Sequence, residues 1–307
     1  MLTIRFWGVR GSVATGERRT AGVGGNTSCV EVICDASERP PGNPGDRPEP
    51  SQGTHIIFDA GTGLRALGAD LMGRRKPVNA HLFLSHYHWD HVQGFPFFVP
   101  AYVPDNHVSL YGAGGAGAVR RVMEGQMSAP CFPVTMTEMK STISFHDIEP
   151  RSDFLVGGVR VRTAPARHPN GCLFYRVDHQ GRSVVYATDT EHSENGEPDA
   201  QLLSLARGAD VLIYDAQYTP EEYNGTVGGG SKRGWGHSTA DEGVRLAQLA
   251  GVSRLVLYHH DPSHDDAEVE RIEALTRARF PEAIAAREGL QIALTPRQEM
   301  AASNQTL

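Results

Sequence analysis

The residues whose types and spacing could do chemistry gather in "LFLSHYHWDHVQG", at 82–94, which places His86, His88, Asp90 and His91 directly after an apolar run. Two residues apart, His86 and His88 project to the same side of an extended backbone. Asp90 and His91 then begin a helix, where their side chains can turn back over the strand end. The stretch therefore offers imidazoles to one metal ion and a carboxylate plus an imidazole to a second, a mixed set that suits zinc, with manganese or iron as alternatives.

Residues further along the chain can complete such a site. His168 stands in the loop-like stretch "APARHPNG", and Asp189 ends "VVYATD", where its two oxygens could bridge two ions. The last ligand is His259 or His260 in "LVLYHHDP", and His259 is preferred because it ends the strand directly. Each of these alone would more often be a structural residue. Their order after an HxHxDH stretch favours a ligand set.

The elements that must position these residues are short apolar strands. Five strand-like runs end in acidic or histidine side chains: "HIIFD" at Asp59, "HLFLSH" at His86, "SVVYATD" at Asp189, "DVLIYD" at Asp215 and "RLVLYH" at His259. A lone acidic residue at a strand end often only caps the next turn. Buried strands place ligand and catalytic groups just beyond their carboxyl ends, so five such ends together favour one shared site.

Helical patterns alternate with these runs, which indicates an α/β fold. Helices are predicted at 63–72, 198–208, 238–251 and 265–280, the third capped by Ser238 and ended by Gly251. No linker divides the pattern, so one domain over 1–295 is predicted. The breaker-rich stretch 36–54 is predicted to be a mobile loop, and the polar stretch 296–307 a flexible tail.

Composition limits the classes of partner. The formal net charge is −7, so a long nucleic acid is not an expected partner. No apolar run is long enough to span a membrane, and the N-terminus lacks a signal-peptide pattern. The four cysteines, Cys29, Cys34, Cys131 and Cys172, have no CxxC spacing. They are expected to be buried free thiols in a reducing cytoplasm.

The set "HYHWDH" followed by His168, Asp189 and His259 resembles the metallo-β-lactamase superfamily of dinuclear metallohydrolases. The resemblance implies an αββα sandwich of two mixed sheets with helices outside, a site on one edge and a possible homodimer. It implies a first metal held by His86, His88 and His168, a second held by Asp90, His91 and His259, and Asp189 as the bridge. It also implies that Asp59 lies beneath the ligands and hydrogen-bonds a ligating histidine.

The segments "DVLIYDAQY" and "WGHSTADEGVRLAQLAGVSRLVLYHH" look like the branch that contains ribonuclease Z and the phosphonate-pathway phosphodiesterases. This resemblance implies that His237 faces the scissile phosphate and that Asp215 orients it. An imidazolium there can stabilise the developing charge and protonate the leaving oxygen. Where ribonuclease Z has His-Glu-Ala-Thr, this chain has Tyr-Asp-Ala-Gln at 214–217. The long basic arm for transfer RNA also has no counterpart, which favours a small or short substrate.

Two further segments could line a substrate pocket. "WGVRGS" and "GGNTS" look like a little-characterised bacterial branch of the superfamily, and they offer Arg10, Asn26 and Ser28. Hairpin turn chemistry explains the second segment equally well. The Gly-rich stretch 224–235 carries Lys232 and Arg233 just before His237. It is either a lid that brings positive charge to a phosphate or a flexible loop.

The sequence as a whole predicts a dinuclear metal-dependent hydrolase that uses metal-bound hydroxide to cleave a small phosphodiester, such as a cyclic nucleotide, a dinucleotide or a short oligonucleotide end. The expected catalytic residues are His237, Asp215 and Asp90, the last of which also binds metal. Within the same fold the alternative is a lactonase or another carboxyl-ester hydrolase. Outside it, the alternative is a metal-binding sensor or interaction protein with little turnover.

Overall fold

The first of two sheets is built mainly from the N-terminal half of the chain. The computed structural model describes residues 1–36, 53–74, 77–193 and 197–297. Within them, this sheet has seven strands in the order β14, β1, β2, β3, β4, β5, β6. They span Gln291–Leu294, Leu2–Gly8, Cys29–Cys34, Thr54–Phe58, Asn79–Phe83, His107–Gly112 and Thr142–Asp147. Strands β3 to β6 are parallel, and β14 to β3 pair antiparallel.

The second sheet repeats this plan with the C-terminal half. In the described part of the chain it has seven strands in the order β13, β12, β11, β10, β9, β8, β7. They span Ala283–Ala285, Arg254–Tyr258, Val211–Asp215, Arg182–Ala187, Cys172–His179, Val159–Ala166 and Asp153–Val156. Strands β10 to β13 are parallel, and β7 to β10 pair antiparallel. Each sheet therefore has parallel strands whose carboxyl ends can carry site residues.

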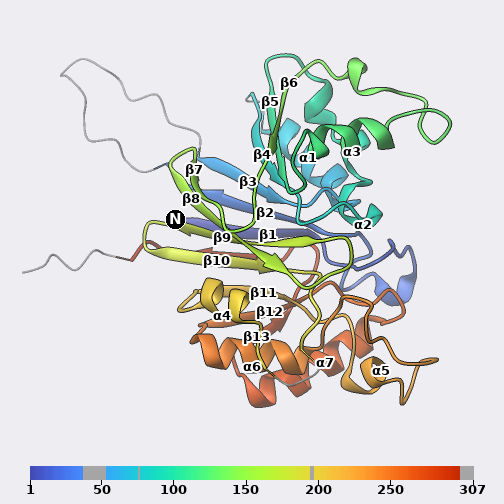
Figure 1. The fold of residues 1–307 in the computed structure, drawn as a ribbon, viewed down its shortest axis with the longest axis vertical. Coiled ribbons are helices and arrows are strands. Elements are labelled where there is room, and N and C mark those ends of the chain that lie inside the picture. Colours follow the sequence, from blue (N-terminus) through green and yellow to red (C-terminus); the bar gives the residue numbers. More distant parts are fainter. Residues whose placement is uncertain (37–52, 75–76, 194–196, 298–307) are drawn as a thin grey trace, which may run out of the picture.

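Helices cover the outer faces of both sheets, as Figure 1 shows. Helices α1 (Gly63–Gly73) and α3 (Ala118–Gln126) lie on the first sheet, and α4 (Ala200–Ala206), α6 (Ala240–Ala250) and α7 (Asp266–Arg279) on the second. Helices α2 (Trp89–Val92) and α5 (Pro220–Asn224) are short, and 3-10 turns span Arg18–Thr20, Phe95–Phe97, Val99–Tyr102 and Met136–Glu138.

Three apolar clusters match these layers. The central cluster lies between the two sheets, where Phe58 from β3 stacks on Tyr186 from β10 with ring centroids 4.9 Å apart. A second cluster lies beneath α1 and α3, and a third beneath α4 and α6. Burying apolar area on both faces of each sheet is the main stabilising contribution in such a layered fold. The predicted αββα sandwich is confirmed.

The four predicted helices are present, but one cap differs. The N-cap of α6 is Thr239, whose hydroxyl accepts from the Glu242 amide at 3.4 Å. Ser238 is fully buried, and its hydroxyl lies 3.0 Å from the Tyr214 hydroxyl instead. The predicted cap at Ser238 was therefore wrong by one residue, because a tertiary contact uses that hydroxyl.

The remaining expectations concern the cysteines, the ranges 36–54 and 296–307, and membrane-spanning helices. Cys29, Cys34 and Cys172 are buried free thiols as predicted, whereas Cys131 is exposed, contrary to the prediction. Most of the expected loop at 36–54 and of the expected tail at 296–307 lies outside the described residues. Among the residues that are described, no helix is both long and apolar enough to cross a membrane.

Candidate metal centre

The candidate site lies where parallel strands from both sheets end. Asp59 follows β3, Asp189 follows β10 and His259 follows β12, and their φ angles are 60°, 54° and 61°. Non-glycine residues rarely adopt this left-handed conformation, which costs on the order of 1–3 kcal/mol for each residue. Such strain persists only where surrounding contacts hold it, and it gathers at functional sites. In this protein, the left-handed conformation occurs at three polar residues that follow three strands.

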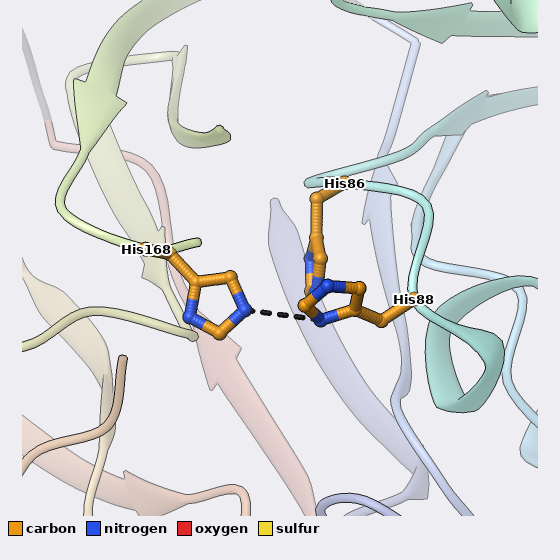
Figure 2. A group of neighbouring side chains, drawn as sticks. All are labelled: His86, His88 and His168. Carbon is orange, nitrogen blue, oxygen red and sulfur yellow. Dashed lines mark hydrogen bonds between the residues drawn. The ribbon is translucent and has the colours of Figure 1, made fainter. Parts of the chain in front are cut away.

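One group of possible ligands is His86, His88 and His168, whose ligand atoms all lie within 4.8 Å of one another. Figure 2 shows the His168 ring facing the rings of His86 and His88 across the site, with His168 Nε2 3.1 Å from His88 Nδ1. His168 donates from Nδ1 to the Gly236 carbonyl at 2.8 Å, which leaves Nε2 unprotonated in the neutral ring. Burial lowers the pKa of all three histidines, so neutral rings, the form that binds metals, are favoured.

His86 supplies the test of whether a cation fits. Its Nε2 is buried and has no hydrogen-bond partner among the described residues. A buried polar atom without a partner is costly, and each one requires an explanation. A divalent ion held by the three imidazoles would give this nitrogen a partner, so the donor set fits a metal.

A second group is Asp90, His91 and His259. His91 Nε2 and His259 Nε2 each lie 3.2 Å from Asp90 Oδ2 and 3.2 Å from each other. The outer nitrogens of both rings are engaged, since His91 Nδ1 donates to Asp59 Oδ2 at 2.7 Å and His259 Nδ1 to Gln217 Oε1 at 2.9 Å. Both rings therefore present Nε2 toward Asp90, as ligating histidines fixed by an outer partner do.

Asp189 lies between the two groups with one oxygen toward each. Its Oδ1 is 3.7 Å from His86 Nε2 and 3.8 Å from His168 Nε2. Its Oδ2 is 3.3 Å from both His91 Nε2 and His259 Nε2. This arrangement is compatible with a carboxylate that bridges two cations.

Asp59 lies beneath the second group and accepts four hydrogen bonds. Besides His91, its donors are the Ser85 amide at 2.7 Å, the Ser85 hydroxyl at 2.8 Å and the Tyr186 hydroxyl at 2.7 Å. Asp59 is fully buried, so no water replaces a lost acceptor. The carboxylate thereby fixes the rotation and the tautomer of the His91 ring.

Replacing Asp59 by asparagine should weaken metal binding about 10- to 100-fold, because the new NH₂ group cannot accept from His91 or Tyr186. A chelator competition titration on the purified protein would measure the change. Tyr186→Phe removes one donor but keeps the Asp59–His91 bond, so its effect should be smaller. Equal metal affinity in wild type and Asp59→Asn would contradict the role assigned to Asp59.

His237 and Asp215 form a pair beside these groups. His237 Nδ1 donates to Asp215 Oδ2 at 2.9 Å, and the His237 ring stacks on that of His259 with centroids 5.0 Å apart. Burial opposes protonation, but the adjacent Asp215 carboxylate outweighs it and raises the pKa of His237 to about 9. Cations bound nearby would lower that pKa. Asp215 is fully buried and also accepts from the amides of Thr190 at 3.2 Å and Gln217 at 3.1 Å.

Of the three residues Arg10, Asn26 and Ser28, which were predicted to line a substrate pocket, two are fully buried. Arg10 is fully buried and donates to the carbonyls of Gly24 at 2.8 Å and His264 at 2.7 Å, so it ties loops together rather than lining a pocket. Ser28 is also fully buried, and Asn26 donates to Glu288 at 3.0 Å.

In the Gly-rich stretch 224–235, Arg233 is exposed and Lys232 is half-buried. The Lys232 ammonium lies 4.4 Å from the Trp235 ring centroid, and Arg233 donates to Asn224 at 2.9 Å. Their role at a substrate stays a prediction.

Of the two alternative histidines, His259 is among the candidate ligand groups of the described residues and His260 is not. His260 Nε2 lies 3.0 Å from the Ala286 carbonyl oxygen, and burial lowers the pKa of His260 to about 3. The preference for His259 therefore agrees with the geometry.

Two contacts to the candidate ligands were not predicted from the sequence. Gln217, two residues after Asp215, orients His259, and the Ser12 amide donates to Asp90 Oδ2 at 2.8 Å. Gln217 was visible only as a departure from the ribonuclease Z pattern. The Ser12 contact uses backbone, so its side chain gave no signal.

Comparison with known proteins agrees with this geometry. Residues 54–260 match the beta-lactamase superfamily domain. A ribonuclease Z of Thermoplasma volcanium is 25% identical over 67% of this chain and 77% of its own length. Two further ribonuclease Z sequences are matched over only 30% and 35% of their lengths.

Solved structures share the fold at low sequence identity. A diphosphatase of the PhnP family superimposes with a TM-score of 0.65 and 17% identity over 96% of this chain and 99% of that one. The short form of human tRNase Z gives a TM-score of 0.62 and 16% identity over 95% and 99%. The family match over residues 54–260, together with the histidine and aspartate groups described above, shows that the chain belongs to the beta-lactamase superfamily, as a metal-dependent hydrolase related to ribonuclease Z.

Proposed function

We propose that this protein is a two-metal phosphodiesterase that cleaves a small phosphodiester, such as a cyclic nucleotide, a dinucleotide or a short oligonucleotide end. The observation that carries the proposal is the His237–Asp215 pair, whose imidazole stacks on that of His259. An imidazolium beside the ligands can also stabilise the negative charge that a phosphodiester gains in its transition state. A phosphodiester expels an alkoxide, which needs a proton.

His86, His88 and His168 would hold one ion and Asp90, His91 and His259 the other, with Asp189 between them. Zinc is the metal we propose, because it accepts mixed imidazole and carboxylate ligands. Two such ions supply an acidified water at neutral pH and positive charge for the phosphate oxygens.

The chain's own contribution is to hold a proton at a fixed place. Asp215 accepts from His237 Nδ1, so the ring can rotate little and its other nitrogen, Nε2, can donate to a leaving oxygen. Asp215 is itself held by backbone amides on both oxygens, which keeps the pair rigid. An imidazole placed in this way contributes typically about 10²- to 10⁴-fold to a proton-transfer step.

The relatives and the charge of the chain support this substrate class. Proteins called ribonuclease Z and a PhnP-family diphosphatase are among the matches, and both names denote phosphorus chemistry. The segment between β5 and β6 forms the short helix α3, and the net charge of −7 offers little attraction to a long polyanion. Transfer-RNA processing is the second candidate, favoured by the sequence match to ribonuclease Z. A cytoplasmic location and a homodimer stay predictions.

A substrate panel on one zinc-loaded sample tests the proposal. It would contain bis(p-nitrophenyl) phosphate, cyclic nucleotides, a dinucleotide, an acyl-homoserine lactone, nitrocefin and a precursor transfer RNA. Turnover of the small diesters without the lactone or nitrocefin is the expected result. Lactone hydrolysis alone would overturn the proposal, cleavage of the precursor RNA alone would favour the second candidate, and no turnover with two ions bound would favour a sensor.

A further inference from the structure

Glu191 stands two residues after Asp189 and holds the loop that precedes His237. Its Oε1 accepts from the Gly234 amide and from the Tyr223 hydroxyl, both at 2.7 Å, and its Oε2 accepts from the Gly236 amide at 3.0 Å. Its own amide donates to the Arg167 carbonyl at 2.8 Å. One residue thus connects the segment after β10, the segment before His168, helix α5 and the Gly-rich loop.

We propose that Glu191 is a positioning residue that sets the places of both His168 and His237. The proposal rests on the function proposed above in so far as these two histidines are a metal ligand and a proton donor. Glu191 itself is not among the candidate ligand groups of the described residues. It would act through the backbone of Gly234 and Gly236.

The link to His168 runs through Gly236. The Gly236 carbonyl accepts from His168 Nδ1 at 2.8 Å, while its amide donates to Glu191. The backbone of Gly236 also packs directly on the ring, since a Cβ added there would lie 2.3 Å from His168 Nδ1. A shift of this peptide would therefore move the ring or release it.

The link from Glu191 to His237 runs along the backbone, from Gly236 to the next residue. Asp215 fixes the His237 ring from one side, but the backbone that carries the ring follows Gly236 directly. The preceding loop contains Gly225, Gly228, Gly229, Gly230 and Gly234, all at positive φ. Glycine loses more conformational entropy on ordering than other residues, so such a loop needs an anchor to keep one conformation. The Glu191 carboxylate supplies two of the anchoring bonds.

A carboxylate suits this position better than an amide of the same shape. Its three partners are all donors, and an ionised carboxylate is acceptor-only on both oxygens. The amide of glutamine would turn an NH₂ group toward at least one of these donors. That donor would lose its partner, which costs about 1–3 kcal/mol when it is buried.

The experiment compares Glu191→Gln with wild type in the full-length protein. In the metal-free form, ¹H–¹⁵N spectra of the histidine rings should show the His168 Nδ1 proton protected in wild type and exchanging faster in the variant. In the cobalt-loaded form, the visible spectrum should change and cobalt affinity should fall about 10- to 100-fold. Activity on the diester found by the panel should fall by a similar factor in kcat, with KM nearly unchanged.

Tyr223→Phe is the matched control, because it removes one donor from the same carboxylate and keeps both glycine contacts. Its histidine and cobalt spectra should resemble those of wild type. Gly236→Ala tests the second half of the link and should reproduce the His168 change even if Glu191→Gln folds poorly.

Unchanged ring exchange, cobalt spectrum and kcat in a folded Glu191→Gln protein would overturn the proposal. So would equal defects in Tyr223→Phe, since they would indicate a general loosening of α5. If wild type binds metal but cleaves no diester, the proposed function fails while the ring and cobalt measurements still decide the role of Glu191.

Discussion

Replacing His237 by alanine should lower kcat for a small phosphodiester by about a hundredfold or more while the metal content stays at the wild-type value. In the proposed reaction, His237 would donate the proton to the leaving oxygen from Nε2, because its Nδ1 donates to Asp215 at 2.9 Å. Steady-state kinetics combined with elemental analysis of the same samples would measure both quantities.

The leaving group makes this test specific. A p-nitrophenolate leaves with little protonation, but the alkoxide of a nucleoside needs a proton, so the loss in His237→Ala should be larger for the nucleotide diester. Asp215→Asn keeps an acceptor for the ring but removes its charge, and it should show the same trend with a smaller loss. Equal losses for both leaving groups would contradict proton donation, and full activity would remove the argument for a phosphodiesterase.

Replacing Asp189 by alanine should reduce the bound ions from two to one or fewer and lower kcat about a thousandfold or more. Asp189 is the one carboxylate in the described residues with an oxygen facing each histidine group, at 3.3 to 3.8 Å. In the proposed two-metal site, its loss would leave each group one ligand short. Metal ions contribute several kcal/mol of transition-state stabilisation, and each 1.4 kcal/mol is about tenfold in rate.

Asp153→Ala is the control for Asp189→Ala. Asp153 pairs with Arg160 at 2.6 Å on the exposed surface, so the same chemical change there should leave metal content and kcat intact. Elemental analysis after gel filtration and diester kinetics would be run on both variants. Retention of two ions by Asp189→Ala would contradict the bridging role.

Much of the fold and of the candidate site could be predicted from the chain itself. The apolar runs that end in Asp59, His86 and Asp189 are strands in the structure or lead directly out of them. Side-chain periodicity fixes which face of an element is buried, and parallel strands bring their carboxyl ends to one edge. The spacing within this stretch then restricts the directions that the side chains of His86, His88, Asp90 and His91 can take.

What connects these residues to the rest of the molecule was decided only by the tertiary structure. Gln217 orients His259, the Ser12 amide reaches Asp90, and Glu191 holds the loop before His237. Arg10 was expected to line a pocket, but in the structure it is fully buried and donates to a backbone carbonyl.

The physical reason for this difference is that some contacts need a particular side chain and others use the backbone. Metal ligands must be particular side chains, so they leave a pattern in the sequence. Backbone amides and carbonyls are present at every residue, and which of them meet depends on loops that converge from distant parts of the chain. The sequence determined the chemistry that the site can do, and the fold decided which contacts hold that chemistry in place.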